Sequence, residues 1–347
     1  MTSEHSKPVA VWLLCICALI FAMIVLGGVT RLTESGLSMV NWHPVTGWLP
    51  PLDEAAWERV FADYRQSPEY RQVNAGMGVS EFKSIFWLEY LHRLGGRVIG
   101  IAFFAPMIYF AAKGWVRGAL LGRVSGLFIL GGLQGVLGWY MVKSGLIDRP
   151  DVSQYRLAAH LALALVILAA VQWVALGLLK PDPAQAPGGA GVNRRLGRGA
   201  WALLGLISVT ILSGAFVAGL NAGHVYNTFP LMDGDLVPGG LWDLSPGYVN
   251  FFENIVTVQF DHRILAISVL ISVGIFHWRS QGVRLTASQR LSVRALLAAA
   301  LVQVGLGITT LVLVVPIPLA ALHQAGAVVL LAVTVWLAHE LRPVVGA

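Results

Sequence analysis

Long apolar stretches recur along the whole chain, and short polar segments that hold most of the charged residues separate them. Each stretch is close to the length of about 20 residues that an apolar helix needs to cross a bilayer core. Since backbone polar groups in lipid must find hydrogen-bond partners within the protein, such stretches can cross only as helices. The pattern predicts eight spanning helices, over residues 9–28, 86–111, 123–142, 157–179, 200–219, 260–277, 294–315 and 319–339.

The composition agrees with a membrane protein. Of the 347 residues, 56% are hydrophobic and 12% are charged, whereas soluble domains carry roughly 25% charged residues. The net charge of +6 would indicate nucleic-acid binding only if the basic residues shared one soluble face. They are spread over several short loops instead, so we expect a lipid bilayer and no nucleic acid among the partners.

The basic residues predict how the chain crosses the membrane. They gather in alternate short loops, over 113–123, 180–198 and 279–294, while the other long loops are mixed or acidic. By the positive-inside rule both termini are then cytoplasmic, and residues 29–85 and 220–258 face outward. The first apolar stretch lacks a small-residue cleavage site, which favours a retained helix over a signal peptide.

Three motifs occur in the same order in both halves of the chain. They pair Glu89-Tyr90-Leu91-His92-Arg93 with Gln259-Phe260-Asp261-His262-Arg263, Gln134-Gly135-Val136-Leu137-Gly138 with Gln303-Val304-Gly305-Leu306-Gly307, and Arg156-Leu157-Ala158-Ala159-His160 with Leu319-Ala320-Ala321-Leu322-His323. A repeat of four helices returns each half to the same side of the membrane. We therefore predict an all-α membrane protein of two pseudo-symmetric four-helix bundles, over 1–180 and 200–347. The segment 181–199, rich in Pro, Gly and Arg, is the expected cytoplasmic linker.

The repeat places one histidine near the outer start of every second helix. These are His92, His160, His262 and His323. A histidine from each of two facing helices can supply both axial ligands of a heme iron. A single histidine in a membrane helix more often only hydrogen-bonds to a neighbour. Four at matched positions favour ligation, since ionisable groups in a membrane are costly and usually functional, and no carboxylate or thiolate cluster suggests a bare metal ion.

Three arginines close to these histidines have two interpretations. Arg93, Arg97 and Arg263 can pair with heme propionates, or they can extend to the outer lipid head groups. Two further histidines, His43 and His224, lie in the outer loops, and the sequence leaves their roles open.

One position breaks the symmetry between the halves. Glu89 lies three residues before His92 and therefore on the same helix face, whereas the equivalent residue is the neutral Gln259. A buried carboxylate can carry protons or stabilise developing positive charge. It can also simply form an ion pair with Arg93 or Lys83. The asymmetry predicts different functions for the two histidine pairs.

Together these motifs resemble the heme A synthase family, in particular its proteobacterial and mitochondrial branch. The resemblance runs from the first to the eighth helix and includes Gly28-Val29-Thr30-Arg31-Leu32-Thr33, Trp42-His43-Pro44, Asn227-Thr228-Phe229-Pro230-Leu231-Met232 and Leu322-His323-Gln324 besides the histidine motifs. Some bacterial members carry an outer-loop cysteine pair that this branch lacks. Here the two cysteines, Cys15 and Cys17, both lie in the first helix.

The resemblance implies an oxidoreductase that serves terminal oxidase assembly. Its reaction is oxidation of the methyl group at porphyrin position 8 of heme O to the formyl group of heme A, by successive hydroxylations and loss of water. It implies a heme b cofactor in the C-terminal half and substrate heme O in the N-terminal half. By this resemblance catalysis falls to Glu89, His92 and His160, and cofactor binding to His262, His323 and Arg263.

The family also suggests where the protein acts and with what. The expected location is the bacterial inner membrane, or the mitochondrial inner membrane in a eukaryote. A heme O synthase, oxidase assembly factors, an electron donor and a second copy of the chain are candidate partners.

A di-heme b-type electron carrier is the main alternative function. It explains four histidines equally well, but it does not explain Glu89 opposite Gln259. Nor does it explain the aromatic outer loops with Trp42, Trp48, Trp57 and Trp242. A transporter fits an internal repeat, but transporter repeats are often inverted, which an even number of helices per half does not give.

Overall fold

The structure, a computed structural model, describes residues 3–41, 47–145, 152–181 and 190–343. Within these ranges the regular structure is helical without β-strands, so the predicted all-α fold is confirmed. Eight of the described helices are long and apolar enough to cross a membrane, which indicates a multi-pass membrane protein. They are α1 (Ser3–Leu32), α4 (Val79–Ala112), α5 (Ala119–Gly145), α6 (Gln154–Leu179), α7 (Ala190–Gly219), α9 (Ile255–Gln281), α10 (Ala287–Val312) and α11 (Ile317–Glu340).

Polar caps start several of these helices before their apolar stretches. Asn254 caps α9, where its side chain accepts hydrogen bonds from the N–H groups of Val256 and Thr257. Thr286 caps α10 and accepts from the N–H of Gln289. Such caps satisfy donors that the first helical turn leaves unpaired. The helices therefore extend beyond the part that the apolar pattern predicts.

The start of α7 also differs from the prediction. The helix begins at Ala190, so residues 190–199 of the expected linker 181–199 are helical. Leu196, in this part of the helix, belongs to the buried apolar core. A segment that reads as polar in sequence thus continues the spanning helix because one of its faces is packed.

The end of α10 lies earlier than expected. The helix was predicted to reach residue 315, but it ends at Val312. Val314 and Val315 have positive φ angles of 60° and 56°, a region that right-handed helices exclude and that β-branched residues rarely adopt. Pro316 then precedes the first residue of α11. The apolar character of the two valines concealed this turn.

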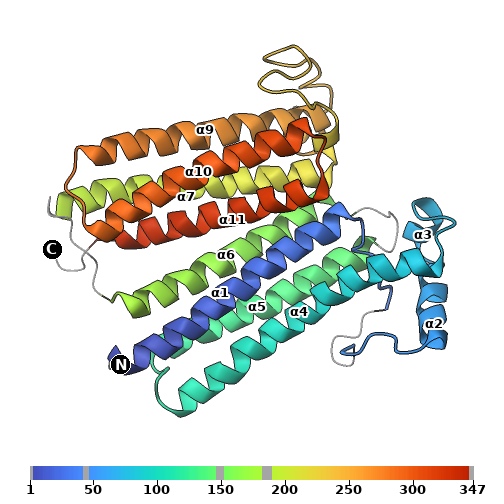
Figure 1. Cartoon of the computed structure of the whole chain (residues 1–347), viewed down its shortest axis with the longest axis horizontal. Coiled ribbons are helices and arrows are strands. Elements are labelled where there is room, and N and C mark those ends of the chain that lie inside the picture. The colour runs from blue at the N-terminus through green and yellow to red at the C-terminus, as the bar shows by residue number, and fades with distance from the viewer. Residues whose placement is uncertain (1–2, 42–46, 146–151, 182–189, 344–347) are drawn as a thin grey trace.

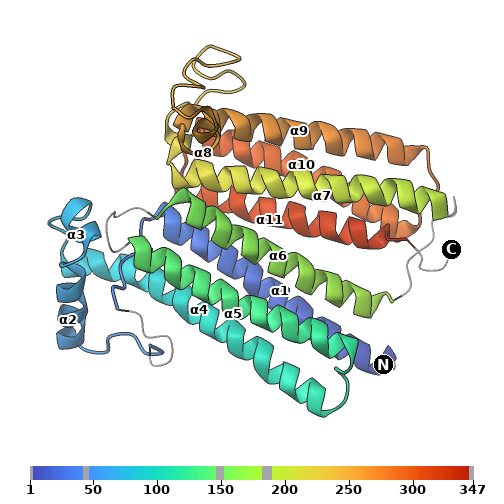
Figure 2. The same cartoon turned by 180° about the vertical axis from the view of Figure 1, so that it is seen from behind.

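The spanning helices of each half lie side by side (Figures 1 and 2). In the first half α1 contacts α4 and α6, and α5 contacts α4 and α6. In the second half α7 contacts α9 and α11, and α10 contacts α9 and α11. The start of α1 and the end of α11 lie at one end of the molecule, and the long loops lie at the other (Figure 1). A pseudo-symmetric relation between the two sets stays a prediction.

The two halves meet along α1, α6, α7 and α11. Polar side chains cross this junction at several depths. The Gln324 side chain on α11 donates to the Ile24 carbonyl of α1 over 2.9 Å, and Gln172 on α6 donates to the Ala332 carbonyl of α11 over 2.8 Å. One buried apolar cluster includes residues from all eight spanning helices. The packing therefore holds both histidine-bearing halves in one body.

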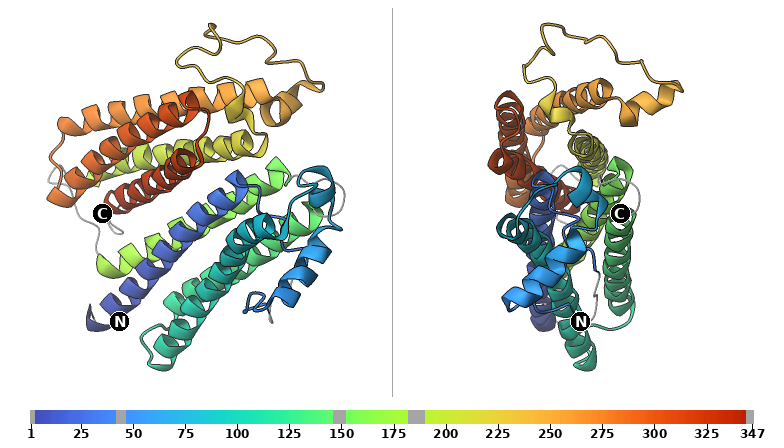
Figure 3. Two further views of the ribbon diagram at one scale, coloured as in Figure 1. Left: turned by 45° about the vertical axis from the view of Figure 1, so that its right-hand side comes forward. Right: turned by 90° about the vertical axis from the view of Figure 1, so that its right-hand side faces the viewer.

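The outer loops of the two halves are built differently. The first contains α2 (Glu54–Tyr64) and α3 (Pro68–Gln72), which lie at the outer end of α4 (Figure 1). The second has only short elements, η1 (Ala222–His224), η2 (Gly247–Val249) and α8 (Asn250–Glu253). Its remaining backbone loops away from the end of α9 (Figure 3).

An aromatic cluster fastens α2 to α4. Its buried members are Trp57, Phe61, Tyr64, Phe82, Phe86 and Tyr90. Several of these rings meet edge to face, as Trp57 and Phe86 do at 4.9 Å between ring centres, and such pairs stabilise packing beyond the area that they bury. The first outer loop is therefore a packed layer over the end of the first half.

Candidate functional site

Each of the four predicted histidines packs its ring against a glycine of a neighbouring spanning helix. The helix pairs are α1 with α4, α5 with α6, α7 with α9, and α10 with α11. A Cβ added to the glycine would meet the imidazole Cε1 at 3.0 Å for Gly27 and His92, 3.0 Å for Gly138 and His160, 3.1 Å for Gly214 and His262, and 2.8 Å for Gly307 and His323. A side chain at these positions would crowd the ring, most severely at Gly307, and glycine avoids this because it has no Cβ. The same packing thus recurs four times.

The two histidines of the second half face one another. The ring centres of His262 and His323 are 6.4 Å apart, and the ring planes are perpendicular. The hydroxyl of Ser213 lies 2.8 Å from His262 Nδ1. The side-chain nitrogen of Gln303 lies 3.1 Å from His323 Nδ1 and also donates to the His323 carbonyl over 2.9 Å. Both rings are therefore oriented through their Nδ1 sides.

The two histidines of the first half differ in the hydrogen bonds of their rings. The Gln134 side-chain nitrogen lies 3.2 Å from each ring nitrogen of His160 and donates to its carbonyl over 3.0 Å. His92 Nδ1 is buried and has no hydrogen-bond partner among the described residues. The two halves thus share the glycine packing but differ in how their imidazoles are held.

Glu89 is buried, with 3% of its surface exposed, and both carboxylate oxygens are engaged. Oε1 accepts from Arg93, whose Nη2 lies 2.6 Å away. Oε2 accepts from the Ser38 hydroxyl and the Met39 N–H, each over 2.7 Å. Both oxygens of the carboxylate are therefore held in place by side-chain and backbone donors. Of the two ion pairs that the sequence left open, the structure has the one with Arg93, while Lys83 lies over the Trp57 ring.

The arginines that directly follow His92 and His262 tie a loop segment to their helices. Arg93 Nη2 also donates to the Met39 carbonyl over 2.7 Å. In the second half, Arg263 donates to the carbonyls of Tyr226 and Thr228 over 2.7 and 2.8 Å. Its Nε is buried and has no hydrogen-bond partner among the described residues. Arg93 thus divides its bonds between Glu89 and loop carbonyls, while Arg263 bonds mainly to loop carbonyls; neither interpretation of these arginines included the loop carbonyls.

Comparisons with known proteins identify the family of the chain. A family model described as cytochrome oxidase assembly protein matches residues 10–335. The chain is 54% identical over 341 residues to the heme A synthase of Nitrosospira multiformis, with 97% of this chain and 94% of that protein covered. It is 47% identical over 344 residues to the heme A synthase COX15 of Bos taurus, with 97% and 83% covered. The chain belongs to the heme A synthase family. The resemblance seen in the sequence is thereby confirmed.

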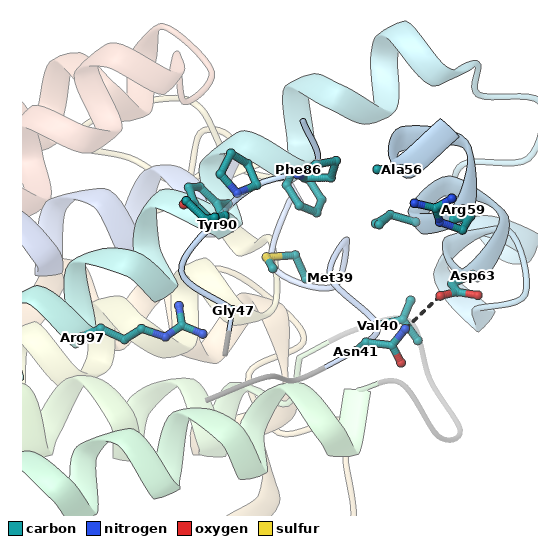
Figure 4. A pocket seen from close by; sticks show the side chains of 14 residues that line it. Met39, Val40, Asn41, Gly47, Ala56, Arg59, Asp63, Phe86, Tyr90 and Arg97 are labelled. Atoms are coloured by element: carbon teal, nitrogen blue, oxygen red, sulfur yellow. Dashed lines mark hydrogen bonds between the residues drawn. The ribbon is translucent and has the colours of Figure 1, made fainter. Parts of the chain in front are cut away.

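In this member of the heme A synthase family, a cavity of about 290 Å³ lies beneath the first outer loop (Figure 4). Arg97, Tyr90 and Phe86 line it from α4, and Arg59 lines it from α2. A hydrogen bond of 2.8 Å between Asn41 and Asp63 spans one side (Figure 4). None of the four histidines is among its described lining residues. The cavity is thus a feature of the outer layer, separate from the histidine pairs.

His224 is exposed in η1, and His43 lies outside the described residues.

Sequence reasoning missed the glycine partners and Ser213. Gly138 and Gly307 end the repeated Gln-containing motifs, and Gly27 stands in a glycine pair at the end of the first apolar stretch. Small residues at matched positions were therefore an available signal. No such signal identified Ser213, because the hydroxyl of a serine in an apolar helix commonly hydrogen-bonds within its own helix.

Proposed function

We propose that this protein converts heme O to heme A for terminal oxidase assembly. The reaction is oxidation of the methyl group at porphyrin position 8 to a formyl group, by successive hydroxylations and loss of water. Membership of the heme A synthase family supports the overall reaction. The observation that carries the site is the pair His262 and His323, in the half where Gln259 replaces the carboxylate of Glu89.

The second half suits a resident heme b. His262 and His323 would hold it, because their ring centres lie 6.4 Å apart and two imidazoles from different helices can ligate one heme iron. Arg263 Nε, buried without a partner among the described residues, remains to donate to a propionate. When bound, heme b supplies one-electron transfer.

The first half then holds the substrate heme O, at His92 and His160. Glu89 places a carboxylate three residues from His92, where Arg93, Ser38 and the Met39 N–H hold both of its oxygens. A carboxylate there favours positive charge that develops nearby during oxidation. The second half has only the neutral Gln259 at that position, which supports its role as the cofactor half.

The membrane arrangement follows from the charges and the packing. Residues 1–180 form the substrate half and residues 200–347 the cofactor half, with both termini cytoplasmic by the positive-inside rule. The location is a bacterial cytoplasmic membrane or the mitochondrial inner membrane. A heme O synthase that supplies the substrate, oxidase assembly factors, a separate electron donor and a second copy of the chain are the proposed partners.

Replacement of Glu89 tests the reaction and the carboxylate together. The native chain, Glu89→Ala and Glu89→Gln are purified from cells that supply heme O, and their extracted hemes are resolved by chromatography. We expect hydroxylated heme or heme A from the native chain, and its loss or arrest in both variants, because the glutamine keeps the shape but removes the charge. Glu81→Gln is the matched control, since Glu81 is an exposed carboxylate on the same helix.

The result that contradicts the proposal is equally clear. If the native chain yields only heme b that is reversibly reduced, the protein is an electron carrier and the synthase proposal is wrong. Heme A from Glu89→Gln at the native level would instead show that the charge of Glu89 has no part in the reaction.

A further inference from the structure

We infer that Ser213 is a positioning residue that holds His262 with its Nε2 free for heme iron, and that His92 has no equivalent support. The inference rests on the proposed function, because it takes His262 as an axial ligand of heme b. It adds a residue of α7 that presents the ligand from the helix behind it. It also assigns different ligand strengths to His262 and its counterpart His92.

The hydrogen bonds of Ser213 fix which nitrogen of His262 carries the proton. Ser213 Oγ lies 2.8 Å from the Thr210 carbonyl oxygen and 2.8 Å from His262 Nδ1. A hydroxyl has a single proton, and we assign it to the Thr210 carbonyl, which can only accept. With this assignment Ser213 Oγ accepts from an Nδ1–H. In a neutral imidazole this leaves Nε2 unprotonated, which is the form that binds a metal.

The first half has the same packing without the hydroxyl. Gly214 lies against His262 with a Cβ-to-Nδ1 distance of 3.6 Å, and Gly27 lies against His92 with the same 3.6 Å. The residue before the glycine is Ser213 in α7 but Leu26 in α1. A leucine side chain cannot accept a hydrogen bond. Accordingly, His92 Nδ1 is buried with no partner among the described residues.

This difference matches the different demands on the two hemes. A ligating imidazole whose other N–H donates to an acceptor is more basic and better oriented. It therefore binds iron more firmly and stabilises the oxidised state, which lowers the reduction potential. A cofactor heme must stay bound and pass electrons on, so support by Ser213 is useful. A substrate heme must leave after oxidation, so an unsupported His92 suits its release.

The simplest alternative is that Ser213 only bonds within its own helix. Serine hydroxyls in apolar helices often donate to the carbonyl three or four residues earlier. Ser208, one and a half turns earlier on α7, does this with Leu204 over 2.7 Å. It thus provides a matched control, since it shares the backbone bond and makes no hydrogen bond to a histidine of the described residues.

Redox titration of bound heme b distinguishes the two roles. The full-length protein is purified in detergent as native chain, Ser213→Ala, Ser213→Thr and Ser208→Ala, and the midpoint potential and low-spin ferric spectrum are recorded. We expect Ser213→Ala to shift the potential to more positive values and to change the spectrum, or to lose heme b. Ser213→Thr, which keeps a hydroxyl, and Ser208→Ala should both resemble the native protein.

His262→Ala separates a failure of this inference from a failure of the proposed function. If His262→Ala loses the heme b spectrum while Ser213→Ala keeps the native potential and spectrum, the role of Ser213 is wrong and the heme site stands. If His262→Ala keeps the native heme b spectrum, His262 is not a ligand of heme b. Both the proposed heme site and the inference about Ser213 are then wrong.

Discussion

Substitution of Gly307 by alanine is expected to remove most of the bound heme b. The new Cβ would lie 2.8 Å from His323 Cε1 and 3.4 Å from its Nδ1, so the ring must move. Because Gln303, on the same helix, also holds this ring, the shift alters the spacing from His262. Overpacking typically costs about 1–3 kcal/mol, and each 1.4 kcal/mol is about tenfold in affinity. We therefore expect heme b to bind about 5- to 100-fold more weakly.

Gly305→Ala is the matched control for this prediction. Gly305 lies two residues earlier on α10, and a Cβ there would meet no atom within 4 Å. Alanine is also the better helix former, so this variant should retain heme b at the native level. Heme b per protein is measured from the absorbance of the pyridine complex after purification. Equal heme contents in Gly307→Ala and Gly305→Ala would mean that His323 needs no glycine behind it.

The sequence predicted the helices and the histidines well for physical reasons. Apolar stretches long enough to cross a bilayer leave helices as the only option, so the count of eight was correct. The internal repeat selected His92, His160, His262 and His323 from nine histidines, and in the structure all four share one glycine packing. The hydrophobic pattern and the internal repeat are thus sufficient to predict the spanning helices and the candidate heme ligands.

The features that could not be predicted from the sequence depend on contacts between segments that are far apart in the chain. The bonds from Glu89 to Ser38 and to the Met39 N–H join residues about 50 positions apart, and no periodicity encodes them. The helix α2 was missed for a similar reason, since aromatic packing against α4 rather than a spanning-length apolar stretch stabilises it. The support of His262 by Ser213 likewise exists only once α7 and α9 are packed.

Replacement of Gly219 by alanine is expected to destabilise the junction between the two halves. A Cβ there would lie 2.6 Å from the Cβ and 2.8 Å from the Cα of Gln154, the first residue of α6. The Gly219 carbonyl also accepts from Arg31 of α1 over 3.3 Å. Three helices from both halves thus meet at this point. Because backbone atoms cannot swing aside as a side-chain end can, we expect α6 and α7 to separate locally.

The size of the effect and its control can be stated for detergent-solubilised protein. Overpacking of about 1–3 kcal/mol should lower the thermal unfolding midpoint of Gly219→Ala by several degrees or more. Gly205→Ala lies on the same helix, where a Cβ would meet no atom within 4 Å, and should unfold like the native chain. A common midpoint for the two variants would contradict the close approach of Gly219 to Gln154. If the junction also sets the relation of the two heme sites, Gly219→Ala should produce less heme A than Gly205→Ala even at temperatures where both remain folded.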